Sequence, residues 1–129
     1  MNMKHLALFS ILLILAGCGF ADKAKEAQKD ADVFHTLLKE QNVDGMMKMV
    51  HPEGLNISPE EDWRYLFEAM AEYEIKEVKK TTGFKTEINN GVTDVELTYT
   101  LKGEAGNFEE KLVLRSMGDS FYILGCQVN

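Results

Sequence analysis

The spacing of apolar residues changes once along this chain, near Glu74. Before that point they recur every three or four positions, as in helices that bury one face, and after it they alternate with polar residues, as in strands that bury one face. A chain of 129 residues has room for one compact domain. The pattern therefore predicts an α+β fold with three N-terminal helices packed on a curved four-stranded antiparallel sheet.

The first two predicted helices follow one another closely. The first begins at Asp22, which suits an N-cap position, and runs to about Gln41. The second is short, is capped by Asp44 and ends before Pro52, which disfavours the helical conformation of the residue before it. The buried faces of the two helices carry Ala24, Ala27, Ala31, Phe34 and Leu38, and then Met46, Met47, Met49 and Val50.

The segment Ser58-Pro59-Glu60-Glu61 predicts the start of the third helix. Serine as N-cap, proline at N1 and glutamate at N3 form a capping box, and the two acids also suit the positive end of a helix. A carboxylate pair for acid-base chemistry is the alternative interpretation of Glu60 and Glu61. The apolar face of this helix, with Tyr73 close to it, carries Trp63, Leu66, Phe67 and Met70.

Four strands are predicted after Glu74. The first runs from Ile75 to about Ile88 and bends at Gly83, and Asn89-Asn90-Gly91 then forms a hairpin turn. We expect the acidic residues of the strands to face outward. The inward residues of the other three strands are Val95, Leu97, Tyr99 and Leu101, then Phe108, Leu112 and Leu114, and finally Tyr122, Leu124, Cys126 and Val128.

The first 17 residues have the layout of an export signal. A short segment with one lysine precedes an apolar run, Leu6–Ala16, that only Ser10 interrupts. As a helix this run is about 17 Å long, which is too short for a hydrocarbon core of about 30 Å. The run ends in Leu15-Ala16-Gly17-Cys18, which resembles the lipobox of bacterial lipoproteins in all four positions.

The resemblance to the lipobox implies that Cys18 is lipidated, with an S-diacylglyceryl group and an N-acyl group. Residues 1–17 are then the signal peptide, residues 18–21 a short tether and residues 22–129 the single domain. Gly19 stands where lipoproteins kept in the inner membrane carry aspartate, so the resemblance implies the periplasmic leaflet of the outer membrane of the cell envelope. A Gram-positive host would void that last inference. An uncleaved anchor or a plain signal peptide is the alternative.

The order and lengths of the elements resemble the NTF2-like, or cystatin-like cone, superfamily, and in particular its small lumazine-binding-like lipoproteins. The resemblance implies a sheet that wraps around helix residues as a cone, whose open end holds a ligand or is filled by side chains. The residues that we expect to line such a pocket are Trp63, Met70, Tyr73 and Tyr99.

Enzymatic members of that superfamily place an acid, a histidine or a tyrosine inside the cone. Here the further candidates are His35, His51 and Tyr122, and a structural role is the preferred interpretation of each. No catalytic triad, zinc-ligand spacing or phosphate-binding glycine loop is present in the sequence. We therefore expect no catalytic residue, no metal and no cofactor.

Cysteine and methionine residues raise two further questions. If Cys18 is lipidated, Cys126 is the one thiol left, and its inward register predicts a buried, inert thiol rather than an intermolecular disulfide. The methionines of the second helix are expected to fill the core. A soft metal such as copper is the alternative, although His51 is the only further ligand close in sequence.

The chain is acidic, with a net charge of −7, and removal of the signal peptide would make it −8. This charge argues against nucleic acid as a partner. We expect a lipid-anchored, non-catalytic module that binds a small apolar ligand or an envelope protein in or beside the cone. The alternatives are a structural or interaction lipoprotein with a filled cone, a homodimer included, and a small enzyme of the hydrolase or isomerase type.

Overall fold

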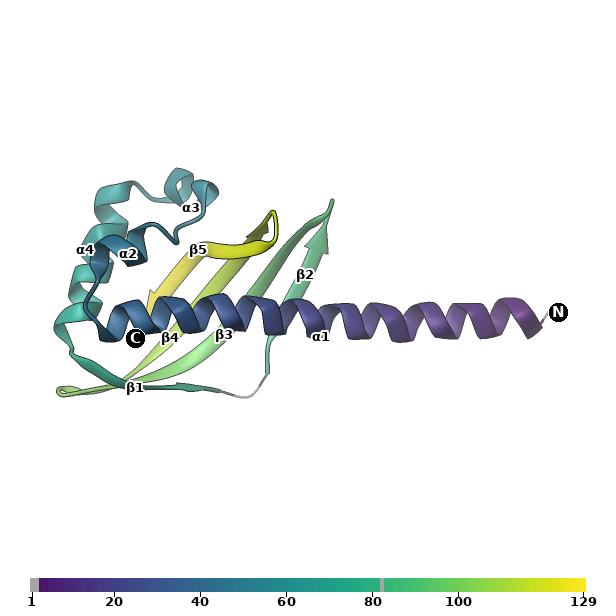
Figure 1. Ribbon diagram of the computed structural model, residues 1–129, viewed down its shortest axis with the longest axis horizontal. Helices are drawn as coiled ribbons and strands as arrows, with labels where there is room; N and C mark the ends of the chain where they lie inside the picture. The colour runs from purple at the N-terminus through teal and green to yellow at the C-terminus, as the bar shows by residue number, and fades with distance from the viewer. Residues whose placement is uncertain (1–2, 82) are drawn as a thin grey trace.

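The computed structural model describes residues 3–81 and 83–129, and the side chains of residues 19–81 and 83–129. Within these residues, four helices precede five strands (Figure 1). The helices are α1 (Met3–Lys39), α2 (Val43–Met47), α3 (Pro52–Ile57) and α4 (Glu60–Glu72). The strands are β1 (Ile75–Lys80), β2 (Lys85–Asn89), β3 (Val92–Gly103), β4 (Gly106–Met117) and β5 (Ser120–Val128). The predicted α+β class with helices first is confirmed.

The sheet is antiparallel and has the order β1-β3-β4-β5, with β2 also paired to β3. Since β4 occupies one edge of β3, β1 and β2 share the other: β1 pairs with residues 99–103 and β2 with residues 92–96. We predicted one bent strand here and four strands in all. The structure has two strands here and five in all, so the predicted number is wrong. Gly83 between the two strands has φ 95°, a left-handed conformation that ends a strand instead of bending it.

The core lies between α1 and the sheet. Figure 1 shows α1 lying across one face of the sheet, with α4 at one end of it. The predicted inward faces of α1 and β3 are confirmed, since all their predicted core residues are at most 5% exposed. Phe34 of α1 meets Phe67 of α4 edge to face, with ring centroids 5.3 Å apart. Burial of each large side chain of this kind contributes roughly 1.5–3 kcal/mol.

The helix starts differ from the predicted ones. α1 is continuous through residue 22, so Asp22 is not its N-cap. The N-cap of α2 is Asn42, whose side chain accepts the Gly45 N–H at 2.9 Å, and Asp44 lies in the first turn. Among the residues that the structure describes, no helix combines the length and apolar character needed to cross a membrane.

One helix was not predicted, and it changes the role of both prolines. Pro52 begins α3 at the first helical position, because His51 before it is extended and caps the helix. Ser58 ends α3, and its N–H donates to the Gly54 carbonyl. The predicted capping box is therefore wrong: α4 begins after Pro59 without a side-chain cap bond. The acids of its first turn still suit the positive end of the helix.

A β-bulge changes which residues of β5 face the core. The pairing between β4 and β5 shifts register between Val113 and Leu114, so that Leu124 is inserted. Phe121 and Ile123 are buried, whereas Tyr122, predicted to face inward, is half-buried on the other face. Cys126, after the bulge, packs against the core as predicted.

Candidate functional site

Three polar side chains meet between α1 and the sheet. His35 of α1 and Glu110 of β4 are in contact, with Nε2 and Oε1 2.6 Å apart, and they are only 3% and 0% exposed. Tyr99 of β3 lies directly opposite Glu110 in the ladder, and its ring meets that of His35 at a centroid distance of 4.4 Å. These three residues form the interior cluster.

Each member of the interior cluster has a polar atom without a partner. Within the described part of the chain, His35 Nδ1, Glu110 Oε2 and the Tyr99 hydroxyl form no hydrogen bond. Burial raises the pKa of Tyr99 far above its usual value, and the nearby carboxylates of Asp32 and Glu110 raise it further. Tyr99 is therefore a neutral phenol at physiological pH, able to donate a proton in a hydrogen bond but not to act as a phenolate.

The interior cluster is closed to solvent. Its three residues are at most 3% exposed, and Tyr99 is itself part of the hydrophobic core. A histidine, a carboxylic acid and a tyrosine could in principle move protons on a substrate. A substrate would need a path to them, and none of the pockets found in the described residues is lined by these three.

An apolar groove lies beside the core instead, between α4 and the end of β5. Trp63 forms one wall, and its indole N–H is held by the Gly54 carbonyl at 2.9 Å. The groove measures about 180 Å³ and is lined by Ile57, Ser58, Asp62, Trp63, Leu66, Leu124, Gly125 and Cys126. Pockets for drug-sized ligands measure about 300–1,000 Å³, so this groove suits a group the size of one side chain.

Cys126, which is half-buried, is one of the residues that line that groove. Its Sγ contacts Met70 Sδ at 4.0 Å. Burial raises the pKa of this thiol well above its usual value, and the charge of Glu110 raises it further. Since the thiolate is the reactive form, the predicted inert thiol agrees with these surroundings.

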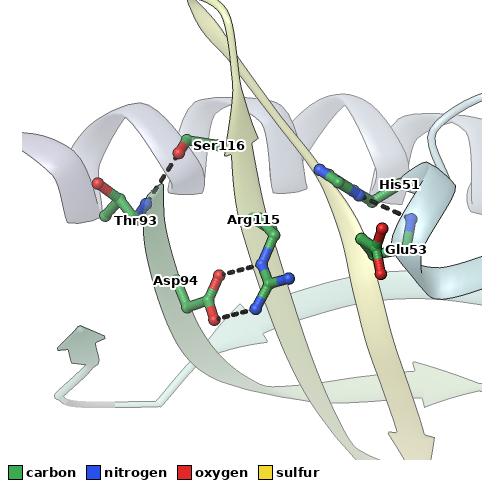
Figure 2. Close-up of polar contacts among 6 residues, drawn as sticks. All are labelled: His51, Glu53, Thr93, Asp94, Arg115 and Ser116. Carbon is green, nitrogen blue, oxygen red and sulfur yellow. Dashed lines mark hydrogen bonds and ion pairs between the residues drawn. The ribbon is translucent and has the colours of Figure 1, made fainter. Parts of the chain in front are cut away.

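A second polar cluster lies on the opposite face of the sheet, where Figure 2 shows its hydrogen bonds. Arg115 of β4 donates two bonds to Asp94 of β3, both 2.8 Å long, and these bonds raise the pKa of the guanidinium. His51 accepts the Glu53 N–H at 3.0 Å. Burial lowers the pKa of His51, the nearby Arg115 lowers it further, and Glu53 and Asp94 oppose the shift. The bonds from Arg115 to Asp94 join β4 to β3, and His51 caps the start of α3.

The four residues predicted to line one pocket therefore lie at different places in the structure. Trp63 lines the groove, Met70 lies beneath it at 2% exposure, and Tyr99 belongs to the interior cluster. Tyr73 was expected to line the pocket but is 37% exposed and stacks on Phe108, with centroids 4.2 Å apart. The proposed lipidation site, Cys18, is not among the residues whose side chains the structure describes.

Glu110 is the residue that the sequence interpretation missed. We expected the acids of the strands to face outward, and that expectation is wrong for Glu110. A signal was present, because Glu110 stands two positions from both Phe108 and Leu112 and so shares their face. Among the described residues, no group of three or more histidine, cysteine or acidic side chains could hold a metal ion.

Comparisons with known proteins identify the fold. No protein-family model and no curated protein matches the chain. A solved structure of a designed NTF2-like protein is similar, with a TM-score of 0.56 and 10% sequence identity, over 80% of this chain and 96% of the designed one. At this identity the likeness concerns the fold alone. The chain therefore has an NTF2-like cone fold.

Proposed function

We propose that this protein is a lipid-anchored, non-catalytic module of the bacterial cell envelope that binds an apolar side chain of a partner protein in the groove beside Trp63. The carrying observation is that side chains fill the interior of the cone, whereas an apolar groove of about 180 Å³ remains open beside it. That volume favours a side chain of a partner over a free apolar ligand.

The lipid anchor rests on the sequence Leu15-Ala16-Gly17-Cys18 at the end of a short apolar run. Lipidation at Cys18 would hold the protein at the membrane, since each buried methylene contributes about 0.8 kcal/mol and two or three acyl chains are added. Gly19 favours the periplasmic leaflet of the outer membrane, and the element order favours the lumazine-binding-like lipoproteins.

Mass spectrometry of the intact protein from membranes tests the anchor. We expect the loss of residues 1–17 and a gain in mass equal to a diacylglyceryl group plus one acyl chain. Cys18→Ser should abolish both changes and leave the protein as a precursor. A mature protein that starts elsewhere and carries no lipid would refute the anchor.

Tryptophan fluorescence tests the groove, because Trp63 is the one tryptophan of the chain. The probe is the anionic dye anilinonaphthalene sulfonate, whose phenyl ring has the size of one aromatic side chain. We expect the dye to bind and to receive energy from Trp63, and we expect Ile57→Ser and Leu66→Ser to weaken both effects. The matched control is Ile88→Ser, because Ile88 is exposed on β2 away from the groove. Equal dye binding by all variants would contradict the assignment.

The same experiment separates the alternatives. A structural lipoprotein whose groove is closed in solution would not bind the dye near Trp63. An enzyme of the isomerase or hydrolase type would need solvent to reach the interior cluster, whose residues are at most 3% exposed. This closure is the reason that we propose a non-catalytic role.

A further inference from the structure

The distance between the core and Cys18 is short. Ala24 is the first residue of α1 that is buried in the core, and it lies six positions after Cys18. Because a helix rises about 1.5 Å per residue, the core begins about 9 Å from the proposed lipid attachment. The headgroup layer of a bilayer is itself about 5–7 Å thick. The domain surface around α1 therefore lies within a few ångströms of the membrane interface.

The surface around the exit of α1 is formed by turns of the sheet. Figure 1 shows α1 leaving the sheet past β2, on the side of the β2–β3 and β4–β5 turns and away from α4. The two turns are neighbours, because the Thr93 N–H of β3 donates to Ser116 Oγ of β4 at 2.9 Å. The β3–β4 turn lies at the opposite end of β3.

Exposed apolar side chains lie on these elements. Four of them define what we call the tip surface, and they are Phe20 of α1, Ile88 of β2, Val92 of β3 and Met117 of β4, at 39%, 50%, 39% and 44% exposure. Residues 88–93, which include the β2–β3 turn, contain no charged residue, although 27% of the chain is charged, and the β4–β5 turn carries a single charged residue, Asp119. An uncharged turn with exposed apolar side chains suits the interface of a bilayer.

We propose that the tip surface rests on the lipid bilayer to which the chain is anchored, a proposal that depends on the proposed anchor at Cys18. The contact is apolar, so it needs no anionic lipid, and the net charge of −8 after removal of residues 1–17 gives no reason to expect attraction to anionic headgroups. The contact also orients the domain. With the tip surface on the membrane, α4 and the Trp63 groove lie at the far end of the domain, open to a partner in the periplasm.

Two labelled variants at opposite ends of β3 test this orientation. Val92→Cys and Ala105→Cys, each combined with Cys126→Ser, place a nitrobenzoxadiazole dye on the β2–β3 turn and on the β3–β4 turn. The full chain is reconstituted into vesicles of phosphatidylethanolamine and phosphatidylglycerol. We expect the dye at position 92 to shift to the blue and to lose quenching by aqueous iodide, while the dye at position 105 stays quenched.

The parent with Cys126→Ser alone separates failure of the anchor from failure of this inference. Dye on the parent would mean a free thiol at Cys18 and would refute the lipidation. An unlabelled parent, combined with equal iodide quenching at positions 92 and 105, would leave the anchor intact and overturn the membrane contact of the tip surface.

A second set of variants tests the apolar nature of the contact. In chains labelled at Met117→Cys, we expect Ile88→Ser with Val92→Ser to restore iodide quenching. The matched control, Leu55→Ser with Tyr65→Ser, replaces two exposed side chains of α3 and α4 and should leave the shielding unchanged. The shielding should persist in phosphatidylcholine vesicles and at high salt. Shielding that salt removes would overturn the proposal, because it would make the contact electrostatic.

Discussion

At the scale of single residues, the contact between His35 and Glu110 is the least expected feature of the core. It joins α1 to β4 through two side chains that are 3% and 0% exposed. Removing two polar groups from water is unfavourable, and their mutual attraction offsets this only in part when Glu110 Oε2 has no partner among the described residues. We infer that the pair specifies how α1 sits on the sheet more than it stabilises the fold.

This inference predicts a strongly non-additive double variant. Glu110→Leu alone should destabilise the protein by about 3 kcal/mol, because it leaves His35 buried without a partner. His35→Leu alone should have a similar effect. The double variant should lie within about 1 kcal/mol of the wild type, since both polar groups are gone. Urea unfolding followed by Trp63 fluorescence measures all three, and additive losses in the double variant would disprove the argument.

The lowered pKa of His51 predicts a loss of stability in mild acid. Burial and Arg115 lower its pKa in the folded state below the usual value of 6.5, whereas the unfolded chain keeps that value. The unfolded state therefore binds a proton first as the pH falls, and stability decreases from about pH 7 downward through the folded pKa. Above that window the effect vanishes.

His51→Asn provides the comparison for this pH effect. Asparagine can still accept the Glu53 N–H as an N-cap but does not titrate. We expect the free energy of unfolding of this variant to fall less between pH 7 and pH 5 than that of the wild type. Identical slopes for the two proteins would show that His51 is not the source of the acid sensitivity.

At the scale of elements, close backbone contacts decide where strands begin and end. Gly103 ends β3 against the carbonyl of Tyr73, which also accepts the Glu104 N–H at 3.3 Å. A Cβ at position 103 would overlap that carbonyl oxygen. The end of α4, the start of β1 and the end of β3 therefore meet at a point where only glycine fits.

Gly103→Ala should consequently destabilise the fold by about 1–3 kcal/mol, since backbone must shift to make room. Gly125→Ala is the matched control within the same sheet, because its Cβ would lie 3.9 Å from Val113 Cβ, an ordinary contact. We expect the control to change stability by less than about 0.5 kcal/mol. Thermal unfolding of the two variants decides the matter, and equal melting temperatures would refute the role of Gly103.

At the scale of the whole molecule, one hydrophobic core joins the elements. Its buried residues come from α1, α2 and α4 and from β1, β3, β4 and β5. The Asp30 carboxylate of α1 also accepts the Phe121 N–H of β5 at 2.8 Å. Since α1 contributes the centre of this core, the sheet has no separate core of its own.

Amide hydrogen exchange tests this cooperativity. We expect the Phe34 and Leu38 amides of α1 and the Leu97 amide of β3 to exchange through one global opening, with the same free energy. The Gly19 amide, in a part of α1 before the first buried residue, serves as the control for local fraying and should exchange at a lower free energy. A lower free energy for Phe34 than for Leu97 would show that α1 docks as a separate unit.

The periodicity of the sequence determined much of this fold. Ala27, Phe34 and Leu38 repeat at helical spacing, and Val95, Leu97 and Leu101 alternate, so their burial followed from the geometry of a helix and a strand alone. The turn at Asn90 and Gly91 was equally local, because both residues adopt the positive φ that a tight hairpin requires.

Only the tertiary structure decided the features that depend on contacts distant in sequence. The inserted residue at Leu124 depends on pairing with β4, and it turned Tyr122 outward. Serine is a residue type that often caps the start of a helix, but Ser58 is the residue at which α3 ends. The burial of Glu110 required His35, 75 positions earlier, to supply the polar partner that makes a buried carboxyl group tolerable. Local spacing carries no information about such partners, because they meet only when α1 lies across the sheet.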